Sequence, residues 1–171
     1  IYVKPVKAGS SFGISRITSP EQLPQAAEKA FEFDNEITLE EEIPGREVGC
    51  AVLGAEKLIL GRVDLIQSPG LFDYNEKYNP KESKIYMPAP IAPELEERIQ
   101  QTAAVLYRLL GCSGFARVDM FLTPQNQIVF NEINTIPGLT AHSRFPNMMK
   151  GAGLELKEVM RVLIELSLKN E

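Results

Sequence analysis

The sequence predicts an α+β fold with mainly antiparallel sheets. Most of the expected strands are neighbours joined by short polar or glycine-containing turns, which is typical of antiparallel hairpins. Three other segments have apolar residues three and four positions apart, which predicts amphipathic helices. Pro44 and Gly45 interrupt this pattern, and a length of 171 residues allows either one large domain or two small ones.

In residues 1–43 the expected order is strand, strand, helix, strand. Residues 1–4 and 14–17 are β-prone and flank a glycine-serine turn, and a third strand begins at Thr38. Before the helix, Ser19 suits the N-cap, Pro20 the first helical position and Gln22 a capping box. The apolar stripe of the helix consists of Leu23, Ala26, Ala27, Ala30 and Phe31.

Residues 44–110 are expected to hold two strands, a long irregular segment and a helix. The strands, 47–53 and 58–66, are joined by a short turn. Residues 67–90 lose regular periodicity, and segments of this length inside a domain commonly serve as lids. A helix then begins at Pro93 and ends before Gly111. Its expected apolar face consists of Leu95, Ile99, Ala103, Leu106, Leu109 and Leu110.

The remaining residues are expected to form a hairpin and a closing helix. The strands 115–122 and 128–133 are joined by a polar turn. The last helix has an apolar stripe of Leu156, Val159, Met160, Leu163 and Leu166.

Composition excludes several classes of protein. The chain has 171 residues, of which 44% are hydrophobic and 24% charged, a balance that excludes an intrinsically disordered chain. A net charge of −5 argues against nucleic-acid binding through bulk charge. No apolar run is long enough for a membrane span, and no export signal is present. Cys50 and Cys112 form neither a disulfide scaffold nor a metal knuckle, so we expect a cytoplasmic protein.

The two late strands carry polar residues inside apolar runs. Alternation puts Arg117 and Asp119 on one face of the first strand, and Glu132 and Asn134 on one face of the second. If these faces coincide, oxygen ligands gather on a half-buried surface at a density that suits Mg²⁺ with bound phosphates. An ordinary network of arginine–carboxylate pairs accounts for the same residues equally well.

Three further features are candidates for phosphate binding. Residues 9–13 offer backbone N–H groups and two hydroxyls, although most glycine-serine turns are only turns. Lys4 is an isolated cation that can hold nucleotide phosphates or lie as a solvated surface lysine. Lys77 and Tyr78 fall in the irregular segment, where they either complete a site or form an exposed loop pair.

Taken in order, these pieces resemble the ATP-grasp part of the D-alanine–D-alanine ligase family. The resemblance covers essentially the whole chain, and the matching segments are Val3-Lys4-Pro5, residues 8–13, Leu39-Glu40-Glu41, residues 45–48, residues 72–78, residues 114–119 and residues 131–140. It implies the ATP-grasp fold, in which two α+β subdomains with mainly antiparallel sheets grip a nucleotide between them. Residues 1–43 would be part of the central subdomain, and residues 44–171 would be the C-terminal subdomain with a lid loop at about 67–90.

The resemblance implies an ATP-dependent ligase of peptidoglycan precursor synthesis. ATP would phosphorylate the carboxylate of D-alanine, and the amine of a second D-amino acid, D-alanine or D-serine, would attack the acylphosphate. The implied cofactors are ATP and two Mg²⁺ ions, with Mn²⁺ as a possible substitute. The full-length protein would be a homodimer in the cytoplasm.

The resemblance also implies a role for individual residues. Those that would bind ATP are Lys4, Glu40, Glu47 and Lys77. Those that would hold the two metal ions are Asp119, Glu132 and Asn134. The catalytic group would consist of Arg117 and the Gly138 N–H at the oxyanion, with Ser10 and Tyr78 as a hydrogen-bonded pair. Ser143 would bind the carboxylate of the second amino acid.

Departures from the family pattern leave other functions open. The chain begins in a strand, without the family's N-terminal domain, so we expect it to be part of a longer protein. Lys7-Ala8 and residues 143–146 are closer to the vancomycin-resistance branch, which uses D-serine or D-lactate, and Lys77-Tyr78 argues against the D-lactate type. The alternatives are another ATP-grasp carboxylate–amine ligase, a non-catalytic nucleotide-binding fragment, and a structural domain with ordinary ion pairs.

Overall fold

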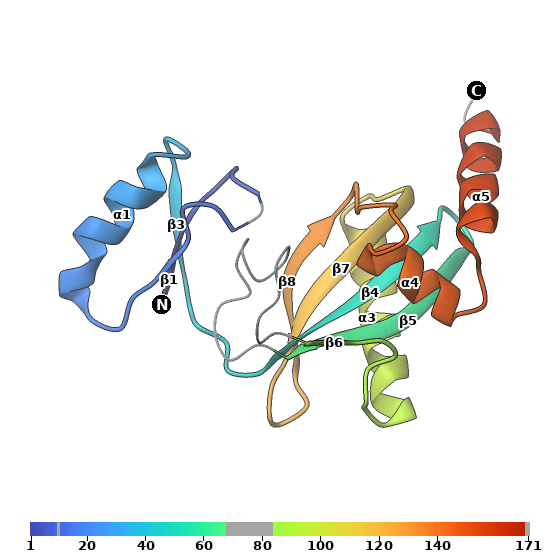
Figure 1. Ribbon diagram of the computed structural model, residues 1–171, viewed down its shortest axis with the longest axis horizontal. Coiled ribbons are helices and arrows are strands. Elements are labelled where there is room, and N and C mark those ends of the chain that lie inside the picture. Colours follow the sequence, from blue (N-terminus) through green and yellow to red (C-terminus); the bar gives the residue numbers. More distant parts are fainter. Residues whose placement is uncertain (10, 68–83, 170–171) are drawn as a thin grey trace. The chain divides into compact units, whose positions relative to one another are not determined.

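The computed structural model describes residues 1–9, 11–67 and 84–169, which form two compact units (Figure 1). One unit contains residues 1–43, and the other contains residues 44–67 together with the chain from Ile85 onward. The expected site residues Ser10, Lys77 and Tyr78 lie outside the described residues, as does most of the expected lid. No helix in the described part of the chain is long and apolar enough to cross a membrane.

The first unit is a three-stranded antiparallel sheet covered on one face by a helix. Its strands, in the order β2-β1-β3, are Ser15–Arg16, Tyr2–Pro5 and Ile37–Glu40. A 3-10 turn, Pro20–Gln22, leads into α1, Leu23–Phe31. The expected element order and the capping box of Ser19 with Gln22 are therefore confirmed. The small core consists of Val3, Ile17, Ala26 and Ala30.

The second unit is built on a five-stranded sheet in the order β6-β5-β4-β7-β8. The strands are β4 Arg46–Gly54, β5 Leu58–Gln67, β6 Lys84–Tyr86, β7 Gly114–Leu122 and β8 Ile128–Asn134. The pairs β4–β5, β4–β7 and β7–β8 are antiparallel. Both units thus combine antiparallel strands with helices, which confirms the predicted α+β class.

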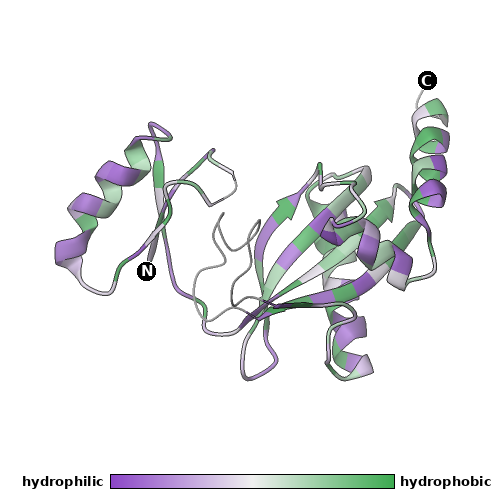
Figure 2. Cartoon of the chain, in the orientation of Figure 1, coloured by the Kyte–Doolittle hydropathy of each residue, from purple (hydrophilic) through white to green (hydrophobic). Residues whose placement is uncertain are grey.

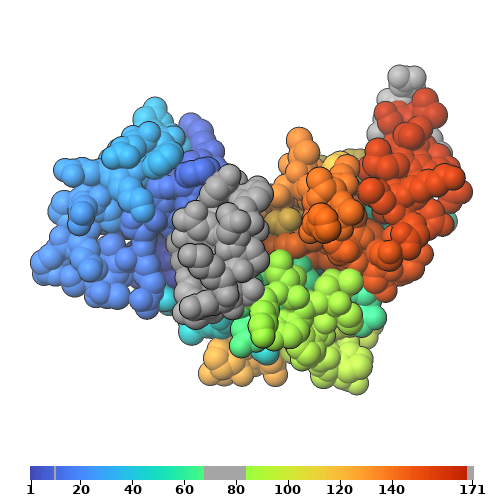
Figure 3. All heavy atoms as spheres, viewed as in Figure 1, coloured from blue at the N-terminus to red at the C-terminus, as the bar shows by residue number. Residues whose placement is uncertain are grey.

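Helices cover both faces of this sheet. The long helix α3, Pro93–Leu109, packs on one face over a core that includes Val48, Val118 and Met120. The other face carries α4, Arg144–Gly151, and α5, Leu156–Lys169, which contact each other and form one continuous orange-to-red region in Figure 3. Their core contains Ala51, Leu53, Phe145, Met148, Met149 and Val159. The two faces of the sheet therefore have separate hydrophobic clusters.

Three details differ from the sequence-based expectation. β6 lies in the segment expected to be irregular, because three residues are too few to show a periodicity. The helix α4 was not expected, because its first turn contains Pro146; proline is tolerated there since the first N–H groups of a helix have no partner within it. On α3, Leu109 and Leu110 are exposed, and the buried stripe continues through Tyr107 instead.

Tyr107 links α3 to the turn between β4 and β5. Its side chain is fully buried, and its hydroxyl donates a 2.8 Å hydrogen bond to the carbonyl oxygen of Gly54. Burial, with a smaller effect from Cys112, raises the pKa of Tyr107 to about 12. The neutral phenol is therefore the form that the fold stabilises.

We expect Tyr107→Phe to lower the unfolding free energy by about 1–2 kcal/mol, because the buried Gly54 carbonyl loses its partner while the ring remains. Urea denaturation near neutral pH measures this loss. The advantage of the wild type should shrink as the pH rises from 10 towards 12, since the unfolded tyrosine ionises first and stabilises the unfolded state. A difference that does not change over this range would contradict the role of the neutral phenol.

Candidate active site

The hairpin β7–β8 brings four of the expected site residues together. Asp119 lies opposite Glu132, and Arg117 lies opposite Asn134. Residues directly opposite each other in an antiparallel pair project from the same side of the sheet. Figure 2 shows hydrophilic stretches within the otherwise apolar strands β7 and β8. The two polar sets therefore share one face, the face that also carries α4.

An irregularity in β8 produces this arrangement. The pairing shifts between Asp119 and Met120, so that Met120 lies opposite Phe130 and Asn131 is an extra residue in β8. Simple alternation from Ile128, which packs on the α3 side, would direct Glu132 to that same side. The bulge reverses the alternation and moves Glu132 to the side of Asp119.

Asp119 is buried and is paired with two guanidinium groups. Its exposed fraction is 1%, and Arg117 contacts both of its oxygens at 2.7–3.0 Å. Arg144, at the start of α4, places Nη2 3.2 Å from Oδ1 of Asp119. An arginine–carboxylate network of the kind that the sequence left open is thus present at Asp119.

Arg144 connects Asp119 to the neighbouring strands. Its Nε and Nη2 donate hydrogen bonds of 2.6 and 2.8 Å to the two carboxylate oxygens of Asp64, and its Nη1 donates one of 3.2 Å to Glu47. Burial lowers the pKa of Arg144, but Asp119, Asp64 and Glu47 outweigh this effect, so that the pKa is raised overall. The guanidinium is therefore held in its charged form. We call the side of the sheet that carries Glu47, Asp64, Asp119 and Glu132 the acidic face.

Among the residues that the structure describes, the acidic face has more carboxylates than cations. Four carboxylates, those of Glu47, Asp64, Asp119 and Glu132, share this side with the two guanidinium groups of Arg117 and Arg144. Excess negative charge at a half-buried surface favours the binding of a cation. Asp119, Glu132 and Asn134 offer only oxygen donors, the type that Mg²⁺ prefers.

The residues present are compatible with a metal ion that takes some of its ligands from the protein and the others from water and phosphate. Among the described residues, no group of three or more His, Cys, Asp or Glu side chains converges as a ready-made metal site. Mg²⁺ commonly takes one or two carboxylates, with water and phosphate oxygens as its other ligands. The Oδ1 of Asn134 accepts a 3.1 Å hydrogen bond from the Ile136 N–H, which fixes the amide at the end of β8.

The loop after β8 brings together Gly138 and Ser143. A Cβ atom added to Gly138 would lie 2.7 Å from Oγ of Ser143, so the Gly138 backbone lies directly against that hydroxyl. Ser143 is the N-cap of α4, and its Oγ lies 2.8 Å from Oγ1 of Thr140 and accepts a 3.2 Å bond from the Thr140 N–H. The hydroxyl of Ser143 thus lies one residue before Arg144, next to the acidic face.

In the first unit the expected nucleotide residues Lys4 and Glu40 contact each other. Nζ of Lys4 lies 2.5 Å from Oε2 of Glu40 and 6.0 Å from the ring centre of Tyr2. Both side chains project from the face of the sheet opposite α1. For Lys4 to bind a phosphate, the lysine has to exchange Glu40 for that phosphate or share the two. Glu47, the third expected nucleotide residue, lies in the second unit.

Two residues of the acidic face were missed in the sequence. Asp64 is a charged residue within an apolar strand, a signal of the same kind that identified Asp119, and it is fully buried. Arg144 has no comparable local signal, because its partners lie 80 and 97 positions earlier in the chain. Only the antiparallel order of β5, β4 and β7 brings these partners together.

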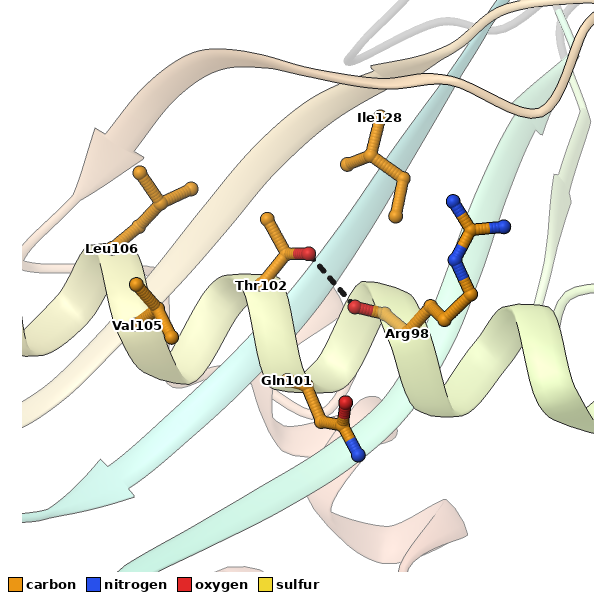
Figure 4. Close-up of a pocket in the computed structure, with 6 residues that line it drawn as sticks. All are labelled: Arg98, Gln101, Thr102, Val105, Leu106 and Ile128. Carbon is orange, nitrogen blue, oxygen red and sulfur yellow. Dashed lines mark hydrogen bonds between the residues drawn. The ribbon is translucent and has the colours of Figure 1, made fainter.

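A surface pocket of about 470 Å³ lies on the opposite side of the sheet, between α3 and β8 (Figure 4). It is lined by Arg98, Gln101, Thr102, Val105, Leu106 and Ile128. Thr102 donates its hydroxyl to the Arg98 carbonyl oxygen at 2.8 Å, and Arg98 donates to the Asn126 carbonyl oxygen. Its polar groups serve the local fold, so we assign the chemistry to the acidic face.

Comparison with known proteins identifies the family. The protein-family model described as "D-ala D-ala ligase C-terminus" matches residues 1–165 of this chain. The vancomycin/teicoplanin A-type resistance protein VanA of Enterococcus faecium is 44% identical over 99% of this chain and 51% of its own length. D-alanine–D-alanine ligase A of Escherichia coli K12 is 42% identical over 99% of this chain and 47% of its own length.

A solved structure gives the same result. The VanG D-Ala:D-Ser ligase of Enterococcus faecalis is 60% identical and superimposes with a TM-score of 0.88 over 96% of this chain and 48% of its own. These likenesses confirm the ATP-grasp fold. The chain spans about half the length of the relatives that it matches. It belongs to the D-alanine–D-alanine ligase family, whose C-terminal part it represents.

Proposed function

We propose that this chain is the ATP- and magnesium-binding part of a ligase that joins D-alanine to D-serine. The observation that carries the proposal is the register of β7 and β8, which pairs Asp119 with Glu132 and Arg117 with Asn134 on one face. The choice of D-serine is supported by the 60% identity with the VanG D-Ala:D-Ser ligase. The ligase A relative, which is 42% identical, makes D-alanine the competing second substrate.

In the proposed reaction, a carboxylate oxygen of D-alanine attacks the γ-phosphorus of ATP, and ADP leaves. The amine of the second amino acid then attacks the acyl carbon, phosphate leaves with its bonding electrons, and the amine loses its proton. Two Mg²⁺ ions held by Asp119, Glu132 and Asn134 would neutralise the transferring phosphoryl group. Arg117 and the Gly138 N–H would stabilise the oxyanion that forms on the acyl carbon.

The other assigned residues would bind the nucleotide and the acceptor. Lys4 would bind phosphates, Glu40 the adenine and Glu47 the ribose, and Lys4 and Glu40 already contact each other in the first unit. Lys77 at the γ-phosphate and the Ser10–Tyr78 pair remain predictions from the sequence. Ser143 would bind the acceptor carboxylate beside the first N–H groups of α4, because a helix N-terminus attracts anions.

The setting of the proposed enzyme follows from its substrates. ATP is a cytoplasmic reactant, and the two cysteines, Cys50 and Cys112, are free thiols, as expected in a reducing compartment. We therefore place the reaction in the cytoplasm. By family resemblance we also expect a homodimer of the full-length protein.

Glu132→Gln in the full-length protein is expected to lower the rate of phosphate release by more than about 100-fold, because the amide removes a negative ligand while keeping its size. A coupled assay with ATP, Mg²⁺, D-alanine and D-serine measures the rate. Glu56→Gln, in the exposed turn between β4 and β5, makes the same charge change and should leave the rate of phosphate release unchanged. Equal rates in the wild type and Glu132→Gln would remove the metal assignment.

The full-length wild type is expected to release phosphate faster with D-alanine plus D-serine than with D-alanine alone. The same assay, with the dipeptides separated by chromatography, measures the preference. A preference for D-alanine would make the chain part of a D-alanine–D-alanine ligase. ATP binding without any amino-acid-dependent turnover would support the non-catalytic alternative and overturn the proposal.

Ser143→Ala is expected to raise the KM for the second amino acid by about tenfold and to change the KM for ATP little, because one hydrogen bond to a carboxylate is lost. Steady-state kinetics with the acceptor and ATP varied separately test this prediction. Ser167→Ala on α5 is a matched control on a helix remote in sequence from the loop. An equal rise of both KM values would indicate a general loss of structure.

A further inference from the structure

Gly49 lies at the centre of the acidic face. It is opposite Asp64 on β5 and opposite Asp119 on β7, and Asp119 is in turn opposite Glu132 on β8. These residues form one row across neighbouring strands, which in any sheet are about 4.8 Å apart. Within this row Gly49 alone has no side chain, although glycine weakens the interior of a strand.

The backbone does not explain a glycine at this position. Among the described residues, the glycines with left-handed φ values are Gly13, Gly45, Gly54, Gly111, Gly114 and Gly153, and Gly49 is not one of them. Its φ and ψ are those of an ordinary strand residue, which any amino acid can adopt. The reason must therefore lie in the space above its Cα.

That space is occupied by charged atoms. A Cβ atom at position 49 would lie 2.5 Å from Nη2 of Arg144, 2.8 Å from Oδ1 of Asp119 and 2.9 Å from Oδ1 of Asp64. Nη2 donates to Asp64 at 2.8 Å and lies 3.2 Å from Asp119. Any side chain at position 49 would therefore enter the point where the guanidinium bridges the two buried carboxylates.

We propose that Gly49 is a positioning residue for the metal-binding face: its missing side chain leaves the space in which Arg144 bridges Asp64 and Asp119. The bridge holds Oδ1 of Asp119 above Gly49, and Asp119 lies directly opposite Glu132 on the next strand. The inference rests on the proposed function in one respect, the role of Asp119 as a metal ligand. Gly49 acts through Arg144 and touches no substrate.

A second glycine of the same sheet provides a matched control. A Cβ atom at Gly61 on β5 would lie 3.0 Å from Cβ of Ala51 and from Cβ of Met148, so this site is also crowded but apolar. Gly61→Ala is expected to lower the melting temperature and to leave metal affinity unchanged. Gly49→Ala is expected to lower both, with Mn²⁺ binding weakened about tenfold, the size usual for loss of a group that orients a metal ligand.

The decisive experiment is a double-mutant cycle in the full-length protein. Mn²⁺ binding in the presence of ATP is measured by electron paramagnetic resonance for the wild type, Gly49→Ala, Arg144→Lys and the double variant. Lysine keeps the positive charge but has no Nη2 above position 49. We therefore expect Gly49→Ala to weaken Mn²⁺ binding about tenfold when residue 144 is arginine. In the Arg144→Lys background the same substitution should weaken it less than about twofold.

An equal loss in both backgrounds, or unchanged Mn²⁺ affinity in Gly49→Ala, would overturn the proposal. If Gly49→Ala does not fold, recovery of folded protein in the double variant supports it, and failure to recover overturns it. The melting temperatures of the same four proteins without metal provide a second double-mutant cycle, which measures the coupling of Gly49 and Arg144 in the absence of any ligand. Absence of amino-acid-dependent turnover in the wild type would therefore refute the proposed function while leaving this coupling measurable.

Discussion

The acidic face depends on the neutralisation of two buried carboxylates. Asp64 and Asp119 have exposed fractions of 0 and 1%, and a buried carboxylate without a partner is strongly destabilising. The countercharge for Asp64 comes from Arg144, the first residue of α4, which packs against the sheet through Phe145, Met148 and Met149. Apolar packing of α4 and the ion pair at its first residue therefore support each other. This coupling also fixes Ser143 and the loop that contains Gly138.

The described residues leave the negative charge of this face only partly neutralised, and this is the property that favours a cation. Arg117 and Arg144 are both engaged with Asp119, so the buried carboxylate is stable without a metal ion. Glu132, which is exposed and opposite Asp119, adds negative charge at the solvent side of the pair. A divalent ion can therefore reach Glu132 directly from solvent, whereas at Asp119 it has to share an oxygen with a guanidinium or displace one. The same residues can therefore form the ion-pair network and contribute ligands to the proposed metal site.

Much of this molecule follows from local sequence patterns. The helices α1, α3 and α5 and the strands other than β6 were predicted because each has a periodicity or a capping signal of its own, as with Ser19 and Gln22. The parts that were missed depend on contacts between distant residues. Arg144 is identified only by its partners on β4, β5 and β7, and α4 was missed because Pro146 lies in its first turn. Whether Lys4, Glu40 and Glu47 bind one nucleotide depends on the arrangement of the two units, which local patterns do not encode.

The bulge at Asn131 shows how a correct local inference can depend on a non-local feature. Alternation within β8 puts Glu132 and Asn134 together whichever way the strand faces, so the pair was predictable. Which side they face is decided by Ile128, which packs against the core under α3, and by the extra residue between it and Glu132. Without that residue Glu132 would point into an apolar cluster, where its charge would have no partner. The hydrophobic core thus sets the register, and the bulge allows the same strand to serve the core at one end and the acidic face at the other.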